Sequence, residues 1–306
     1  MSKLLKVFAN ISCYSPKKTS LMNHSIILAL GAMIAGALAD LIYRVVQKKG
    51  IYPSTFLFYQ SATFAVTVWL IAIASDQVSS IIPSTWVFGL PIGLFSYLGI
   101  FLFVTSLREG KASVNAPIFR LSFVLTSIAA IVILHEPLTL PKVAGIITAV
   151  IGVLSLVDKA ALRSGEQTGG RRSMLILLAA TVSFAIAGIL QKEAINQGST
   201  TIPLIIVSTL TFLTSAFTQM MIRKKLRPNA ITLKMAPFVG LLQLSWSLLL
   251  VESLRTGDVS INFPLAQLSF VLTAILAVFF LKEKLTRDLI VGLIFASLSV
   301  ISFTLA

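Results

Sequence analysis

Charged residues, cysteine and histidine are all scarce in this sequence. Asp, Glu, Lys and Arg make up only 12% of the 306 residues, about half the share of a soluble domain, and apolar residues make up 56%. A single cysteine, Cys13, excludes an intramolecular disulfide. The only histidines, His24 and His135, fall at the ends of apolar segments, where we expect interfacial polar residues. Because no Cys/His ligand set can form, we expect neither a metal nor a cofactor.

Motifs of catalysis and nucleotide binding are also missing. The chain has no G-x-S-x-G, no paired-Asp metal motif and no histidine deep inside an apolar segment, so an enzyme is not expected. It also lacks G-x-G-x-x-G and P-loop patterns, which argues against an ATP-driven pump. The net charge of +14 lies in short loops rather than on a soluble domain. We therefore expect the loops to contact anionic lipid, and expect no nucleic-acid partner.

Long apolar runs are abundant instead. Stretches of roughly 20 residues follow one another with short gaps, and each can cross a hydrocarbon core of about 30 Å as a helix. Alternating segments of about ten residues, which are typical of β-barrels, are not seen. The sequence therefore predicts an all-α, multi-pass membrane protein, which we expect in the plasma (inner) membrane. The ten predicted spans are residues 24–46, 53–74, 84–107, 112–134, 139–157, 173–194, 201–222, 232–254, 259–281 and 285–305.

The chain contains an internal repeat. Residues 107–156, moved forward by 147 positions, align without a gap on 254–303, with about 23 of 50 positions identical. Leucine enrichment alone cannot align Asn, Pro and Glu at one offset. The matched pairs include Asn115 with Asn262, Pro117 with Pro264, Glu136 with Glu283, and "LSFVLT" at 121–126 with the same letters at 268–273.

The repeat divides the chain into two units of five spans. We predict an N-terminal tail at 1–22, a first unit at 23–157, a linker at 158–172 and a second unit at 173–306. The earlier spans follow the shift more faintly, with Arg44 falling beside Lys192. Because five is odd, the second unit must enter the membrane from the opposite side, which gives an inverted repeat.

Two five-span units that each carry "N-x-P…LSFVLT…E-x-L-T…G" resemble the EamA family of the drug/metabolite transporter superfamily. The resemblance covers about residues 24–305. It implies a ten-helix, inverted-repeat carrier for small organic solutes, and family members include exporters of amino acids and other metabolites. The shared pattern is mainly one of helix packing, so it does not identify a substrate.

Arg120 is the most unusual residue because it is charged and lies about 12 Å into its predicted span. A central charge costs roughly 2.5–3.5 kcal/mol on insertion scales unless a partner relieves it. Its repeat mate is the neutral Gln267, so the shared fold does not require the charge. Arg120 could bind a substrate carboxylate or phosphate, or it could pair with Asp40 or reach the headgroups. Asp40 could pair with Arg44 four residues later, titrate as a coupling site, or serve as the counter-ion of Arg120.

Other marked residues lie near the centres or breaks of spans. Pro117 and Pro264 should each bend a span by depriving the carbonyl four residues back of its donor, either as a packing kink or as a hinge. Glu136 and Glu283 are expected to be structural caps of the hairpins. Further candidates could contact substrate or simply join helices. They are Asn115, Asn262, Gln60, Tyr97, Gln243, Trp246 and Gln267.

These features together predict a secondary active transporter that works by alternating access, as an exporter or exchanger. The expected partners are a small organic solute, anionic or zwitterionic, and membrane lipid, with the protein a monomer or homodimer. A channel would need a continuous polar ring, which the spans do not offer. A membrane scaffold would need an interaction domain, and none is evident.

The orientation in the membrane is indicated by two conflicting features. The N-terminal tail and the loops after even-numbered spans hold about seven Lys and Arg residues, and the loops after odd-numbered spans hold about 17. The positive-inside rule then places both termini outside. The family resemblance implies cytoplasmic termini instead. We follow the charge count.

Overall fold

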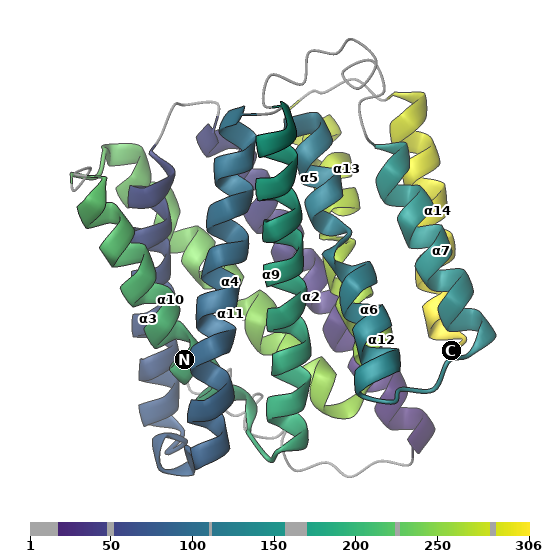
Figure 1. The fold of residues 1–306 in the computed structure, drawn as a ribbon, viewed down its shortest axis with the longest axis horizontal. Helices are drawn as coiled ribbons and strands as arrows, with labels where there is room; N and C mark the ends of the chain where they lie inside the picture. Colours follow the sequence, from purple (N-terminus) through teal and green to yellow (C-terminus); the bar gives the residue numbers. More distant parts are fainter. Residues whose placement is uncertain (1–17, 48–51, 110–111, 157–169, 224–226, 282–285) are drawn as a thin grey trace.

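The computed structural model describes residues 18–47, 52–109, 112–156, 170–223, 227–281 and 286–306, and these form a bundle of helices (Figure 1). One short 3₁₀ turn, η1 (Val78–Ser80), lies between α3 and α4. The helices are α2 (Lys18–Gln47), α3 (Pro53–Ala74), α4 (Pro83–Glu109), α5 (Ala112–Arg120), α6 (Ser122–Ile133), α7 (Leu140–Ser155), α9 (Gly170–Asn196), α10 (Thr201–Ile222), α11 (Ala230–Thr256), α12 (Val259–Gln267), α13 (Ser269–Leu281) and α14 (Arg287–Thr304).

The spans agree with those predicted from hydropathy. Within the described ranges, nine helical segments are long and apolar enough to cross a membrane, and the tenth, α7, is a shorter apolar helix of 16 residues. Two helices begin three or more residues before the predicted spans: α2 begins at Lys18 rather than at residue 24, and α9 at Gly170 rather than at 173. A helix can extend into the polar interface without apolar residues, so hydropathy marks the hydrocarbon crossing and misses these ends.

The two units are interleaved rather than side by side. The first helix of each unit packs along the third helix of the other, so that α2 lies against α11 and α9 lies against α4. The last helices, α7 and α14, pack against each other. Figure 1 shows α2 and α9 starting at opposite ends of the bundle, as the inverted repeat requires. The two units therefore form one all-helical membrane fold.

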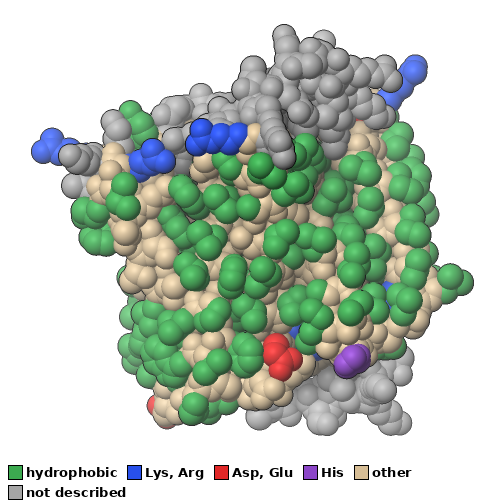
Figure 2. Space-filling model, in the orientation of Figure 1, with side chains coloured by type: hydrophobic (Ala, Val, Ile, Leu, Met, Phe, Trp, Pro, Cys, Tyr) green, Lys and Arg blue, Asp and Glu red, His purple; other side chains and the backbone are tan. Residues whose placement is uncertain are grey.

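The outer surface is suited to lipid. Figure 2 shows hydrophobic side chains spread over the visible face, with Lys and Arg gathered along one end. Among the described residues, Arg172, Arg223, Arg227 and Lys234 are exposed at that end, beside the start of α9, the end of α10 and the start of α11. We call it the basic end. The opposite end carries the α6–α7 loop and the turn between α11 and α12.

Thiol labelling tests the inverted arrangement. In a Cys13→Ser background, cysteines placed at Tyr52 and Gln197 should react with an impermeant maleimide from opposite sides of the membrane. Tyr52 follows α2 and Gln197 follows α9, and these first helices of the two units cross the bundle in opposite directions. Labelling of both from the same side would contradict the inverted repeat, whatever the sequence match.

Candidate functional site

The fourth span of each unit is broken near its middle. Regular α-helix ends at Arg120 in one unit and at Gln267 in the other, and resumes after one intervening residue. At the breaks, the amide of Val124 donates to Leu121 O (2.9 Å) and that of Val271 to Leu268 O (3.0 Å), which are tight three-residue turns. Such turns in mid-helix are often hinges or functional positions.

The α-helical conformation continues through both prolines. Pro117 lies inside α5 and Pro264 inside α12, and each break follows about one turn later. Because proline has no N–H, the carbonyl four residues before it has no helical donor, so the ladder is already weakened at that point. The break is a second interruption, on the C-terminal side of each proline. The two breaks lie at corresponding positions of the repeat.

The breaks bring Arg120 into contact with Gln267 and Asp40. The guanidinium donates from Nη1 to Gln267 Oε1 (2.8 Å) and from Nη2 to Asp40 Oδ2. Three elements therefore meet at one cation: α5 supplies Arg120, α12 its repeat mate, and α2 the carboxylate. The Asp40 carboxylate also lies 3.4 Å from the hydroxyl of Ser269. The side chain of Arg44, the other predicted partner of Asp40, lies outside what the structure describes.

This group of residues is partly accessible. The side chains of Arg120 and Asp40 each keep 21% of their surface exposed, whereas Gln267 keeps 1%. The Nε2 atom of Gln267 is buried and has no hydrogen-bond partner among the described residues. A buried amide donor without a partner costs about 1–3 kcal/mol. The site therefore contains a partly exposed ion pair and, next to it, a buried amide donor without a hydrogen-bond partner.

Close helix packing fixes the position of Asp40. One turn before it, a Cβ on Gly36 would lie 3.0 Å from Trp246 Cδ1 and 3.1 Å from Ser269 Cβ. Any larger residue at that position would therefore push α2 away from α11 and α13. The predicted candidate Trp246 thus lies next to the charged pair, where its ring packs on α2.

An aromatic row extends from Trp246 to α5. Phe184 lies 6.5 Å from Trp246 and 5.3 Å from Phe119 between ring centroids, and Phe119 stacks on Phe103 at 4.3 Å. The row crosses α11, α9, α5 and α4, and Phe119 immediately precedes Arg120. The row cannot be recognised from the sequence, because single Phe residues in apolar runs do not show which of them meet in the fold. It gives the charged pair an apolar wall.

The other amide and aromatic candidates fall into two groups. Gln60 lies close to Asp40, since its Oε1 accepts a hydrogen bond from the hydroxyl of Tyr43, less than one turn beyond Asp40 on α2. Tyr97 points elsewhere and donates to Gln219 Oε1 on α10 (2.7 Å). Gln243 is half-buried on α11 and makes no hydrogen bond within the described chain. Tyr97 therefore does not join the group around Arg120.

Asn115 and Asn262 make equivalent contacts at the two hairpins. Asn115 Nδ2 donates to Ser106 O, and Asn262 Nδ2 to Ser253 O, each at 2.9 Å. Both side chains are buried, and both bind the last turn of the preceding helix. Each bond ties the start of the fourth span to the end of the third, and Ser253 O also accepts a hydrogen bond from the Gly257 amide (3.0 Å). The geometry indicates hairpin packing, and we leave both residues out of the proposed site.

The two ends of the bundle differ in burial. All nine residues of α12 are buried, whereas Ala116, Ile118 and Arg120 of its mate α5 remain partly exposed. The helix α12 packs against α2 and α6, and the described part of α5 has no comparable packing against α13, the counterpart of α6. The structure is therefore more tightly closed around α12 than around α5.

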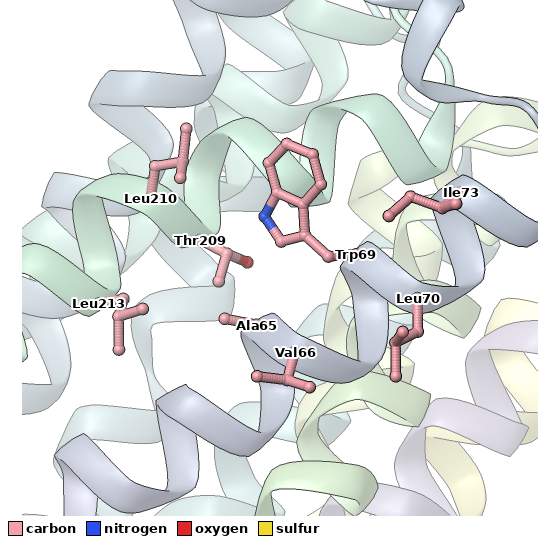
Figure 3. A pocket seen from close by; sticks show the side chains of 8 residues that line it. All are labelled: Ala65, Val66, Trp69, Leu70, Ile73, Thr209, Leu210 and Leu213. Atoms are coloured by element: carbon pink, nitrogen blue, oxygen red, sulfur yellow. The ribbon is translucent and has the colours of Figure 1, made fainter.

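One pocket lies on the lipid-facing surface, away from the charged pair. It holds about 360 Å³ between α3 and α10. Figure 3 shows Trp69 turned over it, with Val66, Leu70 and Ile73 on one side and Leu210 and Leu213 on the other. Its lining is almost wholly apolar, so it could orient no polar solute. We expect lipid chains to cover it.

Comparison with known proteins places the whole fold. The model of the EamA-like transporter family matches residues 23–157 and again 171–305. The chain belongs to the EamA-like transporter family. The family match, the repeated five-span units and the lipid-facing surface agree that it is a multi-pass membrane protein of a transporter family.

One solved structure, described only as a crystal structure of a protein, superposes on this EamA chain with a TM-score of 0.76 at 17% identity. The match covers 92% of this chain and 96% of the other. At that identity the likeness shows the fold alone. A comparison with curated proteins finds no match.

The hairpin asparagines provide a test of structure against solute binding. Asn262→Ala removes the side-chain hydrogen bond to Ser253 O, which keeps its bond from the Gly257 amide, so the free energy of unfolding should fall by only about 0.5–1.5 kcal/mol. Asn115→Ala, the matched change in the other unit, should act similarly. Thermal unfolding in detergent measures both. If either variant kept its Tm but lost ligand binding, the structural assignment would be wrong.

Proposed function

We propose that this EamA protein is a secondary active transporter of small organic solutes, exporter or exchanger, that works by alternating access in the plasma membrane. The observation that carries the proposal is the contact of Arg120 with both Asp40 and Gln267 at the two helix breaks. In transporters built from inverted repeats, binding sites form near the midplane where helices are discontinuous. Arg120 and Gln267 likewise lie at the ends of discontinuous helices, α5 and α12.

The donors around Arg120 suit an anionic group. A guanidinium has five N–H donors, and the two described contacts use two of them. The remaining donors, together with the unpaired Nε2 of Gln267, could hold a carboxylate or phosphate. A charge-assisted bond of this kind contributes about 1.5–3 kcal/mol. The solute should therefore carry a negative group.

Asp40 would then exchange partners rather than lose one. An incoming anion competes with Asp40 for the guanidinium, and the freed carboxylate needs a cation or a proton. In a zwitterionic solute, the ammonium group could satisfy Asp40 while the carboxylate binds Arg120. The charged pair would thus be closed on itself when the site is empty and opened by a solute that offers both charges.

The charges break the symmetry that the fold keeps. Arg120 has the neutral mate Gln267, and the alignment that places Arg44 beside Lys192 places Asp40 on Gly188. A Cβ at Gly188 would lie 2.7 Å from the ring of Phe263, so the second unit has no space for a carboxylate there. Both charges therefore belong to the first unit. If packing common to both units required these charges, charged residues would also stand at the corresponding positions of the second unit.

The rival functions lack comparable support. A channel needs a continuous polar path, whereas the aromatic row from Phe103 to Trp246 places an apolar wall next to the charged pair. A membrane enzyme needs a reactive constellation, and the described residues contain no group of three or more His, Cys, Asp and Glu that could hold a metal. Saturable solute exchange in liposomes, far slower than ion flow, would separate carrier from channel.

Substitutions at Arg120 test the site. A panel of anionic and zwitterionic metabolites is first screened by thermal shift, because a bound ligand stabilises the folded protein. For a ligand found in this way, Arg120→Gln should raise Kd about tenfold to a hundredfold. Arg120→Lys keeps the charge and loses the fork, so it should retain stability but recover only part of the affinity. Tyr97→Phe, outside the group, is the matched control and should bind normally.

The same series distinguishes a purely structural pair. If Arg120 only neutralises Asp40, then Arg120→Lys should bind ligand as the wild type does. In that case Arg120→Gln and Asp40→Asn should each reduce folded yield, and the double variant should recover part of it. That pattern would refute Arg120 as the solute-binding residue.

A further inference from the structure

The end opposite the basic loops is held closed by contacts between the two units. Glu136, in the α6–α7 loop of the first unit, accepts hydrogen bonds from the amides of Val259 (2.7 Å) and Ser260 (3.0 Å) and from the Ser260 hydroxyl (2.5 Å). Its carboxylate therefore caps the N-terminus of α12 in the second unit, where negative charge is favoured. The sequence predicts Glu136 as a cap of its own hairpin, whereas in the structure it caps a helix of the other unit.

An ion pair between a buried lysine and a partly exposed aspartate lies beside this cap. Lys142, at the start of α7 and 1% exposed, donates from Nζ to Asp258 Oδ2 (2.5 Å) and to Pro137 O (2.8 Å). Asp258, 36% exposed, is the residue that precedes α12. The pair thus joins the hairpin of the first unit to the same turn that Glu136 caps. Lys192 of α9 donates to Leu254 O and Gly257 O (2.6 and 2.9 Å), a contact within the second unit that holds the same turn in place.

The repeat does not supply this ion pair at the basic end. The shift of 147 that aligns Glu136 with Glu283 also aligns Lys142 with Leu289 and Asp258 with Lys111. A leucine and a lysine cannot form an ion pair. The threonine N-cap of the next helix, Thr139 or Thr286, is present in both units, whereas Glu283, the repeat mate of Glu136, lies outside the described residues. The Lys142–Asp258 pair has no counterpart at the repeat-related positions.

From this difference we propose that the Lys142–Asp258 pair is a one-sided latch that sets the resting conformation of the carrier. It joins the two units only while α12 lies against α6 and α7. Opening this end would take both charges apart, which is costly for a lysine as buried as Lys142. Because the repeat places no equivalent pair at the opposite end, the empty protein rests closed at the α12 end and open toward α5. The burial of every α12 residue and the exposure of part of α5 fit that state.

Removing the pair should shift the equilibrium between the closed and the open conformation of the α12 end. An interaction made in only one state displaces the equilibrium by its whole differential free energy. Losing the latch should therefore increase the fraction open at the α12 end by about tenfold relative to the closed fraction. No solute is needed for this effect. The latch can thus fail while the proposed solute site stands, and the reverse.

Distance measurement by pulsed electron paramagnetic resonance tests the latch on purified, solute-free protein in lipid nanodiscs. Spin labels are attached to cysteines at Leu138 and Arg255 in a Cys13→Ser background, one on each side of the ion pair. The latched protein should give mainly one short distance. Lys142→Met should add a longer distance and lower the closed-to-open ratio about tenfold. Lys234→Met, an exposed lysine at the basic end, is the matched control and should leave the distribution unchanged.

Asp258→Asn provides the second variant, because it removes the charge at a partly exposed position and keeps a good helix-capping side chain. It should shift the distances as Lys142→Met does, and the double variant should shift them no further, since both changes remove one pair. Unchanged distances in a folded Asp258→Asn protein would overturn the proposal. So would shifts of the two single variants that simply add.

Discussion

A guanidinium in the interior of a membrane must be neutralised, and the arrangement around Arg120 follows from that constraint. Insertion scales assign such a charge roughly 2.5–3.5 kcal/mol, and a carboxylate in the same place is also costly. The long Arg120 side chain reaches the Asp40 carboxylate on α2, and α2 itself packs against α11, α12 and α13. Gly36 allows α2 that approach to its neighbours, and the break after Arg120 ends α5 where the side chain meets Gln267.

The molecule combines a symmetric scaffold with asymmetric charges. The helix breaks, the asparagine contacts and the threonine caps occur in both units, at corresponding positions of the hairpin. The Arg120–Asp40 pair and the Lys142–Asp258 pair occur once. In the proposed carrier, rocking of two similar units would use the shared features, whereas solute binding and a preferred resting state would use the differences between the units. This division explains why identical letters in the repeat are mostly structural.

The sequence predicted the architecture well because hydropathy and the repeat are properties of whole segments. The spans, the two units and the family were all evident from it, and Arg120 and Asp40 were singled out by their charge. Their roles remain predictions. Contacts between distant elements could not be read in this way. The Glu136 cap joins loops 123 residues apart, and the Phe184 ring is one of 20 Phe residues with nothing local to mark it. The prolines predicted a bend in each fourth span, and the break one turn after each proline carries no local sequence signal.

The most direct test of the central claim is a structure of the protein with a ligand found in the thermal-shift screen. The account predicts that an anionic group of the ligand lies within hydrogen-bonding distance of both the Arg120 guanidinium and Gln267 Nε2, with Asp40 displaced from its present contact. A ligand bound elsewhere, with the Arg120–Asp40 contact intact, would contradict it.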